Sequence, residues 1–145
     1  QNHARPLSVV ERFLAGTHSD SLVDVNIIDD TVSRHVRCHG FPGFPDGEFE
    51  GRDDYKAFFR IFRSSFTDME FRILSLRTID DFVSAHWEIT VSHVGPFAGI
   101  DPAGTRVTVD GVALYRMEDG LIAETWLHMN EPLLLAQLGA RPAAA

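Results

Sequence analysis

The sequence is poor in cysteine, in basic residues and in long apolar runs, and each shortage excludes a class of protein. Its only cysteine, Cys38, excludes an internal disulfide framework and a cysteine-based metal cluster, and it fits a reducing cytoplasm. Lys and Arg total 13 against 21 Asp and Glu, a net charge of −8. The basic residues are scattered, which excludes the clustered positive charge of a nucleic-acid surface. No segment reaches the roughly 20 apolar residues of a membrane helix, so we expect neither nucleic acid nor membrane as a partner.

The composition is otherwise that of an ordinary globular protein. Hydrophobic residues make up 44% of the 145 positions and charged residues 23%, which is enough apolar material for one sizeable core. No internal repeat or linker interrupts the chain. We therefore expect a single domain over 1–145, with its core at about 6–139 and frayed ends.

Helix patterns dominate the first half of the chain. The acidic pair Asp53–Asp54 opens the strongest of them, with basic residues on its polar side. Its apolar side is aromatic and is expected to cover a sheet; it consists of Tyr55, Phe58, Phe59, Phe62 and Phe66. Before it the pattern predicts a helix over 6–15 ended by Gly16, a shorter helix from Ser19 or Asp20 through Val25, and a strand over 31–38.

The second half alternates between apolar and polar residues, which predicts strands. Asp80–Asp81 and Asp119–Gly120 are placed as hairpin turns. The expected strands span 69–79, 82–94, 105–117 and 121–130, and a short helix follows between Pro132 and Gly139. This order predicts an α+β fold, with helices on one face of a curved antiparallel sheet that encloses a pocket.

The last strand carries the most unusual side chains. Trp126, His128 and Asn130 share one face, and Leu127 and Met129 share the other. An indole, an imidazole and an amide in one row are unusual for plain core. We interpret the row as one wall of a small-molecule pocket, with a wet sheet face or a subunit contact as the alternatives.

A loop rich in turn-forming residues spans 39–51, and Phe41 and Phe44 are interleaved with its glycines and prolines. They are expected to cover something apolar, either the core edge or the mouth of a ligand site. His39, at the start of this loop, is a candidate for the same mouth.

The sequence contains no recognisable binding motif for a metal or an organic cofactor. His86 and Glu88 have the form His-x-Glu, but no paired-cysteine segment follows, so the zinc deaminase pattern fails. Both are placed on the solvent or interface side of their strand. Glycine-rich dinucleotide motifs, phosphate loops and nucleophile elbows are missing. We expect no cofactor and no metal.

Three segments together resemble a known family. His93 with 94–104 is similar to the "H-x-G-x-F-x-G-x-x-P-x-G" stretch of SnoaL-like polyketide cyclases, also called ester cyclases. Residues 117–126 resemble their "R-x-x-D-G-K-I-x-E-x-W" hairpin, and 137–139 their terminal "Q-L-G". The resemblance covers essentially the whole chain and implies the cone-shaped barrel of nuclear transport factor 2-like proteins. It also implies a homodimer and a role in secondary metabolism such as antibiotic biosynthesis.

The resemblance also locates the residues that act in the cyclases. An Asp near the end acts there as acid and base, with a His on the preceding strand assisting; the corresponding places here hold Asn130 and Ala113. An amide cannot accept a proton at neutral pH. The anthracycline C-1 hydroxylase-like branch of the family is similar in carrying Asn at this place, which keeps Asn130 a candidate.

Three hypotheses follow. The first is a cofactor-independent enzyme that acts on an aromatic-polyketide or similar hydrophobic carbonyl compound, with His128 as base and Asn130 as donor to the enolate oxygen. The second is a binding protein of the same fold without catalysis, and the third is a scaffold domain that dimerises through its sheet. The expected substrate-binding residues are Trp126, His93, Tyr115, His39 and Phe41; for His93 and Tyr115 simple packing is the alternative.

Overall fold

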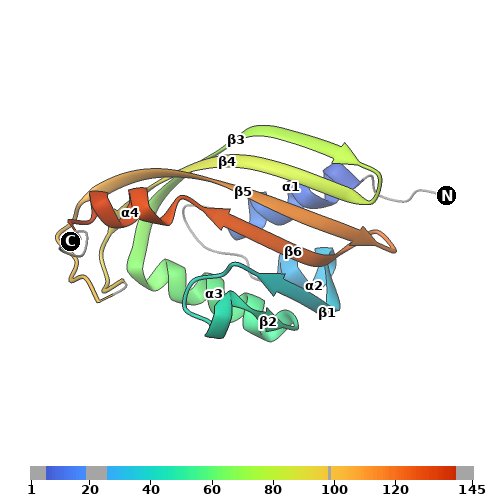
Figure 1. Ribbon diagram of the computed structural model, residues 1–145, viewed down its shortest axis with the longest axis horizontal. Helices are drawn as coiled ribbons and strands as arrows, with labels where there is room; N and C mark the ends of the chain where they lie inside the picture. Colours follow the sequence, from blue (N-terminus) through green and yellow to red (C-terminus); the bar gives the residue numbers. More distant parts are fainter. Residues whose placement is uncertain (1–5, 19–25, 98, 140–145) are drawn as a thin grey trace.

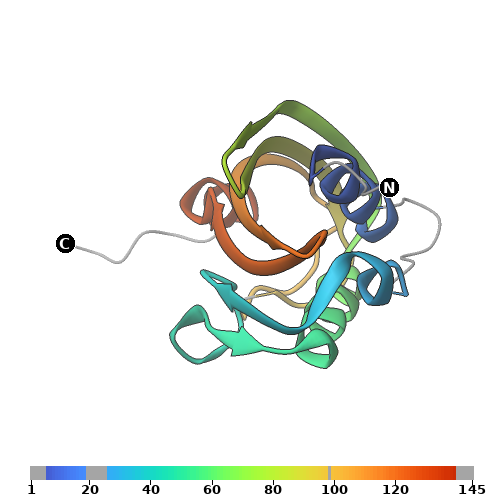
Figure 2. The same cartoon turned by 90° about the vertical axis from the view of Figure 1, so that its right-hand side faces the viewer.

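A curved sheet forms one layer of the molecule, and helices cover its concave side (Figures 1 and 2). The computed structural model describes residues 6–18, 26–97 and 99–139. The six strands are β1 (Val32–His39), β2 (Phe49–Glu50), β3 (Phe66–Ile79), β4 (Phe82–His93), β5 (Arg106–Glu118) and β6 (Leu121–Met129). The described helices are α1 (Pro6–Thr17), α2 (Ile27–Thr31), α3 (Arg52–Ser65), α4 (Glu131–Gln137) and the 3-10 turn η1 (Pro45–Gly47). The predicted α+β fold is confirmed.

The strand order is β2-β1-β6-β5-β4-β3. The four consecutive strands from β3 to β6 pair as the predicted antiparallel meander. β1 lies parallel to β6, so the sheet is mixed and the expectation of a wholly antiparallel sheet is wrong at this pair. A parallel partner needs a long crossover, and here that crossover contains α3 and the strands β3, β4 and β5.

The inward face of each central strand is apolar. In β4 the buried residues alternate with half-buried polar ones, from Val83 through Trp87 to His93, as the sequence pattern predicts. α3 meets this face with Tyr55, Phe58 and Phe59, all buried. The predicted aromatic stripe is therefore confirmed, except that its last member, Phe66, already belongs to β3.

Some helix ends differ from the expected ones, at places where a side chain forms a hydrogen bond with the backbone. α1 runs past Gly16 to Thr17, whose hydroxyl donates to the Phe13 carbonyl at 2.8 Å. The short helix expected between 19 and 25 lies outside the described residues. α4 begins after Asn130, which caps it by accepting from Leu133 N, and Pro132 sits in its first turn as expected. None of the described helices has the length and apolarity needed to cross a membrane.

Gly40 lets the loop after β1 run close to β6. Its φ is +83°, and a Cβ at this position would collide with the Leu127 carbonyl oxygen. Phe41 N then donates to the Gly47 carbonyl at 2.9 Å, which closes the loop. This loop brings the Phe41 ring onto the core.

Candidate functional site

An aromatic cavity lies between the concave face of the sheet and helices α1 and α3. Its volume is about 40 Å³, room for roughly three waters. α1 and the residue after it contribute Phe13, Leu14 and His18, and α3 contributes Tyr55, Phe58, Phe59 and Phe62. The remaining lining residues are Phe41, Trp87, Ile89, Ala113, Tyr115, Thr125, Leu127 and Met129. None of these lining residues, which all belong to the described part of the chain, carries a carboxylate, an ammonium or a guanidinium group.

Two of the predicted wall residues lie in this cavity. Phe41 packs edge-on against Phe58, with ring centroids 4.9 Å apart. Tyr115 packs edge-on against Phe13 at 5.9 Å. Their placement agrees with the expectation, and their contact with a ligand stays a prediction.

The last strand faces the other way from the expected orientation. Leu127 and Met129 line the cavity, whereas Trp126 is half-buried and His128 is exposed on the convex face. The predicted wall of indole, imidazole and amide is therefore wrong. The cause is an extra residue, because Arg116 pairs with Glu124 while Met117 pairs with Ile122. One bulged residue moves every later side chain to the opposite face.

Asn130 has a structural task at this edge. Its amide oxygen caps α4, and its Nδ2 lies 3.4 Å from Asp110 Oδ1. Asp110 in turn lies 3.2 Å from His86 Nε2. Asn130 is exposed and lies outside the cavity. Ala113, which by the family resemblance corresponds to the assisting His of the cyclases, lines the cavity. Asn130 and His128 therefore lose the geometric basis for the catalytic roles expected of them.

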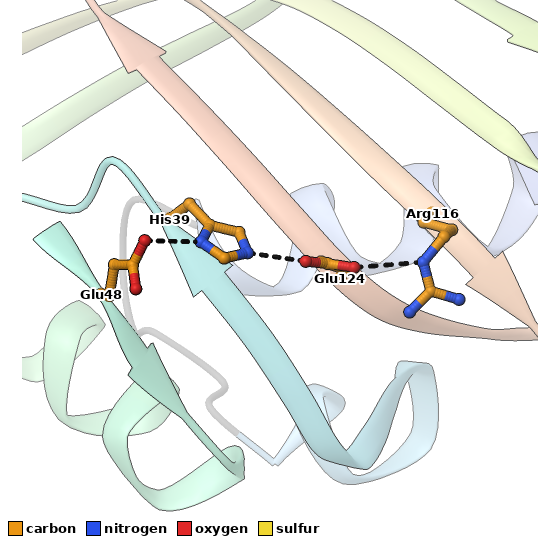
Figure 3. Close-up of polar contacts among 4 residues, drawn as sticks. All are labelled: His39, Glu48, Arg116 and Glu124. Atoms are coloured by element: carbon orange, nitrogen blue, oxygen red, sulfur yellow. Dashed lines mark hydrogen bonds and ion pairs between the residues drawn. The ribbon is translucent and has the colours of Figure 1, made fainter.

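His39 lies in a charge network on the convex side rather than at the cavity mouth. Its Nδ1 is 3.1 Å from Glu48 and its Nε2 is 2.7 Å from Glu124, which also accepts from Arg116 Nε at 3.2 Å (Figure 3). The imidazole stacks on Trp126 with centroids 5.4 Å apart. The expected mouth position of His39 is wrong, because both ring nitrogens are engaged with carboxylates away from the cavity.

These contacts set the charge of His39. Partial burial lowers the pKa of His39, but hydrogen bonds to Glu48 and Glu124 and their negative charges more than offset this, so the pKa is raised. Partial burial raises the pKa of Glu124, but the hydrogen bonds from His39 and Arg116 outweigh this effect and bring that pKa below its usual value. The network therefore favours a charged imidazolium.

His93 is buried but does not line the cavity. It is 1% exposed and stacks on Phe66 with ring centroids 5.4 Å apart. Its Nε2 has no hydrogen-bond partner among the described residues. The packing alternative for His93 fits this position better than a role in substrate binding.

The histidine that does line the cavity is His18, which the sequence patterns did not single out. Its Nδ1 lies 3.1 Å from the Leu14 carbonyl oxygen and 2.9 Å from Thr17 Oγ1. A carbonyl oxygen only accepts, so these bonds place the proton on Nδ1. Nε2 is then the nitrogen with a free lone pair, and it is the one available to a ligand.

Aromatic rings enclose the His18 imidazole, although part of its surface stays accessible. Phe71 stacks on it at 4.2 Å and Phe59 meets it edge-on at 5.5 Å. Burial lowers the pKa of His18 to about 4; the hydrogen bond to Leu14 opposes this shift, and the positive charge of Arg63 adds to it. His18 is therefore a neutral imidazole at pH 7.

Three hydroxyl groups add polar points to the aromatic wall. Tyr55, Tyr115 and Thr125 line the cavity and are at most 3% exposed. Burial raises the pKa of both tyrosines, so both keep their protons. Thr125 lies beside Tyr55, yet its Oγ1 makes no hydrogen bond of standard geometry with any described residue. Such groups can donate to a carbonyl or enolate oxygen of a ligand.

Simple signals in the sequence could have found His18 and Thr125. His18 follows Leu14 at i+4 and so continues the apolar stripe of α1. Thr125 shares parity with Leu127 and Met129, two apolar residues of the last strand. A polar residue on an apolar stripe marks a group that faces the core.

The comparisons with known proteins agree with this fold. Residues 9–138 match the family model described as SnoaL-like polyketide cyclase. TsrD from Streptomyces laurentii is 27% identical over 92% of this chain and 93% of its own, with a TM-score of 0.79. No protein of curated function matches the sequence.

Two further solved structures are similar. AclR, a proposed hydroxylase from Streptomyces galilaeus, is 24% identical over 99% of this chain and 87% of its own, with a TM-score of 0.80. A proposed SnoaL-like polyketide cyclase from Jannaschia sp. CCS1 is 20% identical over 98% and 99%, with a TM-score of 0.83. At these identities the two likenesses establish the fold alone.

Proposed function

Because the chain belongs to the SnoaL-like polyketide cyclase family, we propose that it abstracts a proton next to the carbonyl group of a neutral, hydrophobic compound and stabilises the resulting enolate. The observation that carries this proposal is a neutral imidazole, His18, that borders the same aromatic cavity as three buried hydroxyl groups. Attack of this carbanion on a second carbonyl group of the substrate gives a cyclase product, and its reaction with dioxygen as the oxidant gives a hydroxylase product.

The walls define the substrate class. Aromatic side chains supply most of the lining, and such surfaces stack on flat rings. An ionised ligand would lose its hydration without gaining a counter-ion from any of the lining residues. An aromatic-polyketide or similar ketone, uncharged in its bound part, is the ligand whose chemistry matches these lining residues.

The chemistry of the step follows from the free lone pair. The Cα–H bond of the ketone breaks, the proton goes to His18 Nε2, and the electron pair moves onto the carbonyl oxygen. Tyr55 or Thr125 donates a hydrogen bond to that oxygen. The pKa of His18 is low while the cavity holds no negative charge. An enolate formed beside the imidazolium stabilises that imidazolium through direct charge attraction.

One observation favours a second candidate, a binding protein without turnover. No carboxylate lines the cavity among the described residues, and the family resemblance implies that Ala113 corresponds to a place that holds a His in the cyclases. An aromatic lining without a carboxylate can contact a hydrophobic ligand without turning it over. A homodimer stays a prediction of the family resemblance, and a cytoplasmic location stays a prediction from the single cysteine, Cys38.

Exchange of the α-protons of propiophenone for deuterium, followed by NMR, distinguishes the two candidates. We expect the protein to accelerate exchange and His18→Ala to lower that acceleration about 100-fold or more. Tyr55→Phe is expected to have a smaller effect. His128→Ala is the matched control, an exposed histidine outside the cavity, and should exchange at the wild-type rate.

The opposite pattern would reject the assignment. Exchange that survives in His18→Ala but is lost in His128→Ala would identify His128, on the convex face, as the base. Binding of the ketone without exchange in any variant would favour the second candidate.

A further inference from the structure

A second hollow lies on the surface beside the aromatic cavity, and we call it the outer groove. Its volume is about 280 Å³, several times that of the inner cavity. Its lining residues come from α3 and from two proline-containing loops, the one after β1 and the one between β4 and β5. Its principal lining residues are Pro42, Phe44, Ile61, Phe62, Pro96 and Phe97.

Two aromatic rings separate the outer groove from the inner cavity. Phe58 and Phe62 are the residues that line both. They lie one turn apart on α3, with ring centroids 6.3 Å apart and planes inclined by 29°. Side-chain rotation, which needs no change in the backbone, can therefore alter the partition between the two spaces.

The outer groove is built for hydrocarbon. No charged side chain is among its described lining residues. Its one hydroxyl, that of Ser65, already donates to the Pro96 carbonyl at 2.8 Å. Ile61 is 62% exposed at the rim, so an apolar group laid in the groove removes aliphatic surface from water. A polar group there would find no free donor among the lining side chains.

The inner cavity has the complementary chemistry and too little room. It holds the imidazole of His18 and the hydroxyls of Tyr55 and Thr125, yet about 40 Å³ accommodates little more than a few waters. An aromatic ketone cannot fit there while Phe58 and Phe62 stay where they are. The adjoining groove supplies the missing volume.

We propose that the outer groove and the inner cavity form one binding site for an elongated carbonyl compound. Its carbonyl end lies by His18 and Tyr55, and its alkyl chain or further ring lies in the groove against Ile61 and Phe97. Phe62 turns aside to join the two spaces. This assignment rests on the proposed function for the position of the carbonyl group, and it adds that the substrate is long and apolar at its other end.

A series of alkyl phenyl ketones from propiophenone to heptanophenone tests the groove. Dissociation constants are measured for the wild type, Ile61→Glu and Ile79→Glu. Ile79 is a matched control, because it is 66% exposed but lies at the end of β3, outside the groove lining. We expect wild-type affinity to rise about threefold per methylene group. Ile61→Glu should flatten this rise, whereas Ile79→Glu should follow the wild type.

Deuterium exchange measured on the same ketones keeps the two proposals apart. Exchange that depends on His18, with equal affinity for all chain lengths, would overturn the outer groove and leave the proposed function standing. A rise with chain length that is the same in Ile61→Glu would also overturn it. A rise that Ile61→Glu abolishes, without exchange of any ketone, would support the groove and reject the catalytic step.

Discussion

The two faces of strand β6 differ sharply in the side chains that they present. On the concave side Leu127 and Met129 join an aromatic cavity without charged groups. On the convex side Glu124 belongs to a network of charges with His39 and Arg116. The comparison teaches that the strand register, and not the chemical interest of a side chain, decides which residues can meet a ligand.

The same contrast appears in two histidines. His18, among aromatic rings, has a pKa lowered to about 4, and His39, between two carboxylates, has a raised pKa. One imidazole is therefore kept neutral and the other charged by the same fold. The neutral one keeps a free lone pair at Nε2, and the charged one bridges Glu48 and Glu124.

The largest difference is expected from placing the same charge on either face of β6. Leu127→Asp buries a carboxyl in the cavity and should lower the free energy of unfolding by about 4 kcal/mol. His128→Asp, on the exposed side, should change it by no more than about 0.5 kcal/mol. Urea unfolding of the two variants provides the comparison. Equal losses would contradict the observed orientation of the strand.

A smaller effect is expected from protonating His18. The unfolded chain binds a proton at an ordinary pKa near 6.5 and the folded chain only near 4, so stability falls as the pH drops through this window. Between pH 7.5 and 5 the loss attributable to His18 should be about 2 kcal/mol. His18→Gln removes it. Urea unfolding at both pH values measures the difference, and parallel losses in wild type and variant would show that His18 is not held neutral.

The smallest change in stability is expected from the titration of His39 on the convex face, and its dependence on pH has the opposite sign to that of His18. A raised pKa means that the folded protein holds the His39 proton more tightly than the unfolded chain does. The stabilisation is therefore complete below pH 6.5 and is lost as the pH rises through the folded-state pKa. For this partly exposed network it should reach at most about 1 kcal/mol. The stability difference between wild type and His39→Gln should shrink from pH 6 to pH 9, and a constant difference would argue against a charged His39.

Periodicity predicted the elements because it is set by backbone geometry. The aromatic stripe from Tyr55 to Phe62 identified α3, and the alternation around Trp87 identified the inward face of β4. Each of these signals repeats over several turns or pairs of residues, so a local irregularity does not hide it.

The site was harder to predict because single residues control it. Ala123, the extra residue opposite the Arg116–Met117 step, inverts the rest of β6, and nothing in its type announces a bulge. His18 lies one residue beyond α1, where the helix was expected to have ended at Gly16. The parallel pairing of β1 with β6 depends on contacts far apart in the sequence, which no local pattern encodes.

The central claim is that ligands meet the concave face of β6, and the methionine methyl groups test it directly. The chain has three methionines; Met129 lines the cavity, whereas Met69 and Met117 do not. Titration of methyl-labelled protein with propiophenone should shift the Met129 signal well beyond the other two. A stationary Met129 signal, with shifts in the rings of Trp126 and His128 instead, would contradict the account.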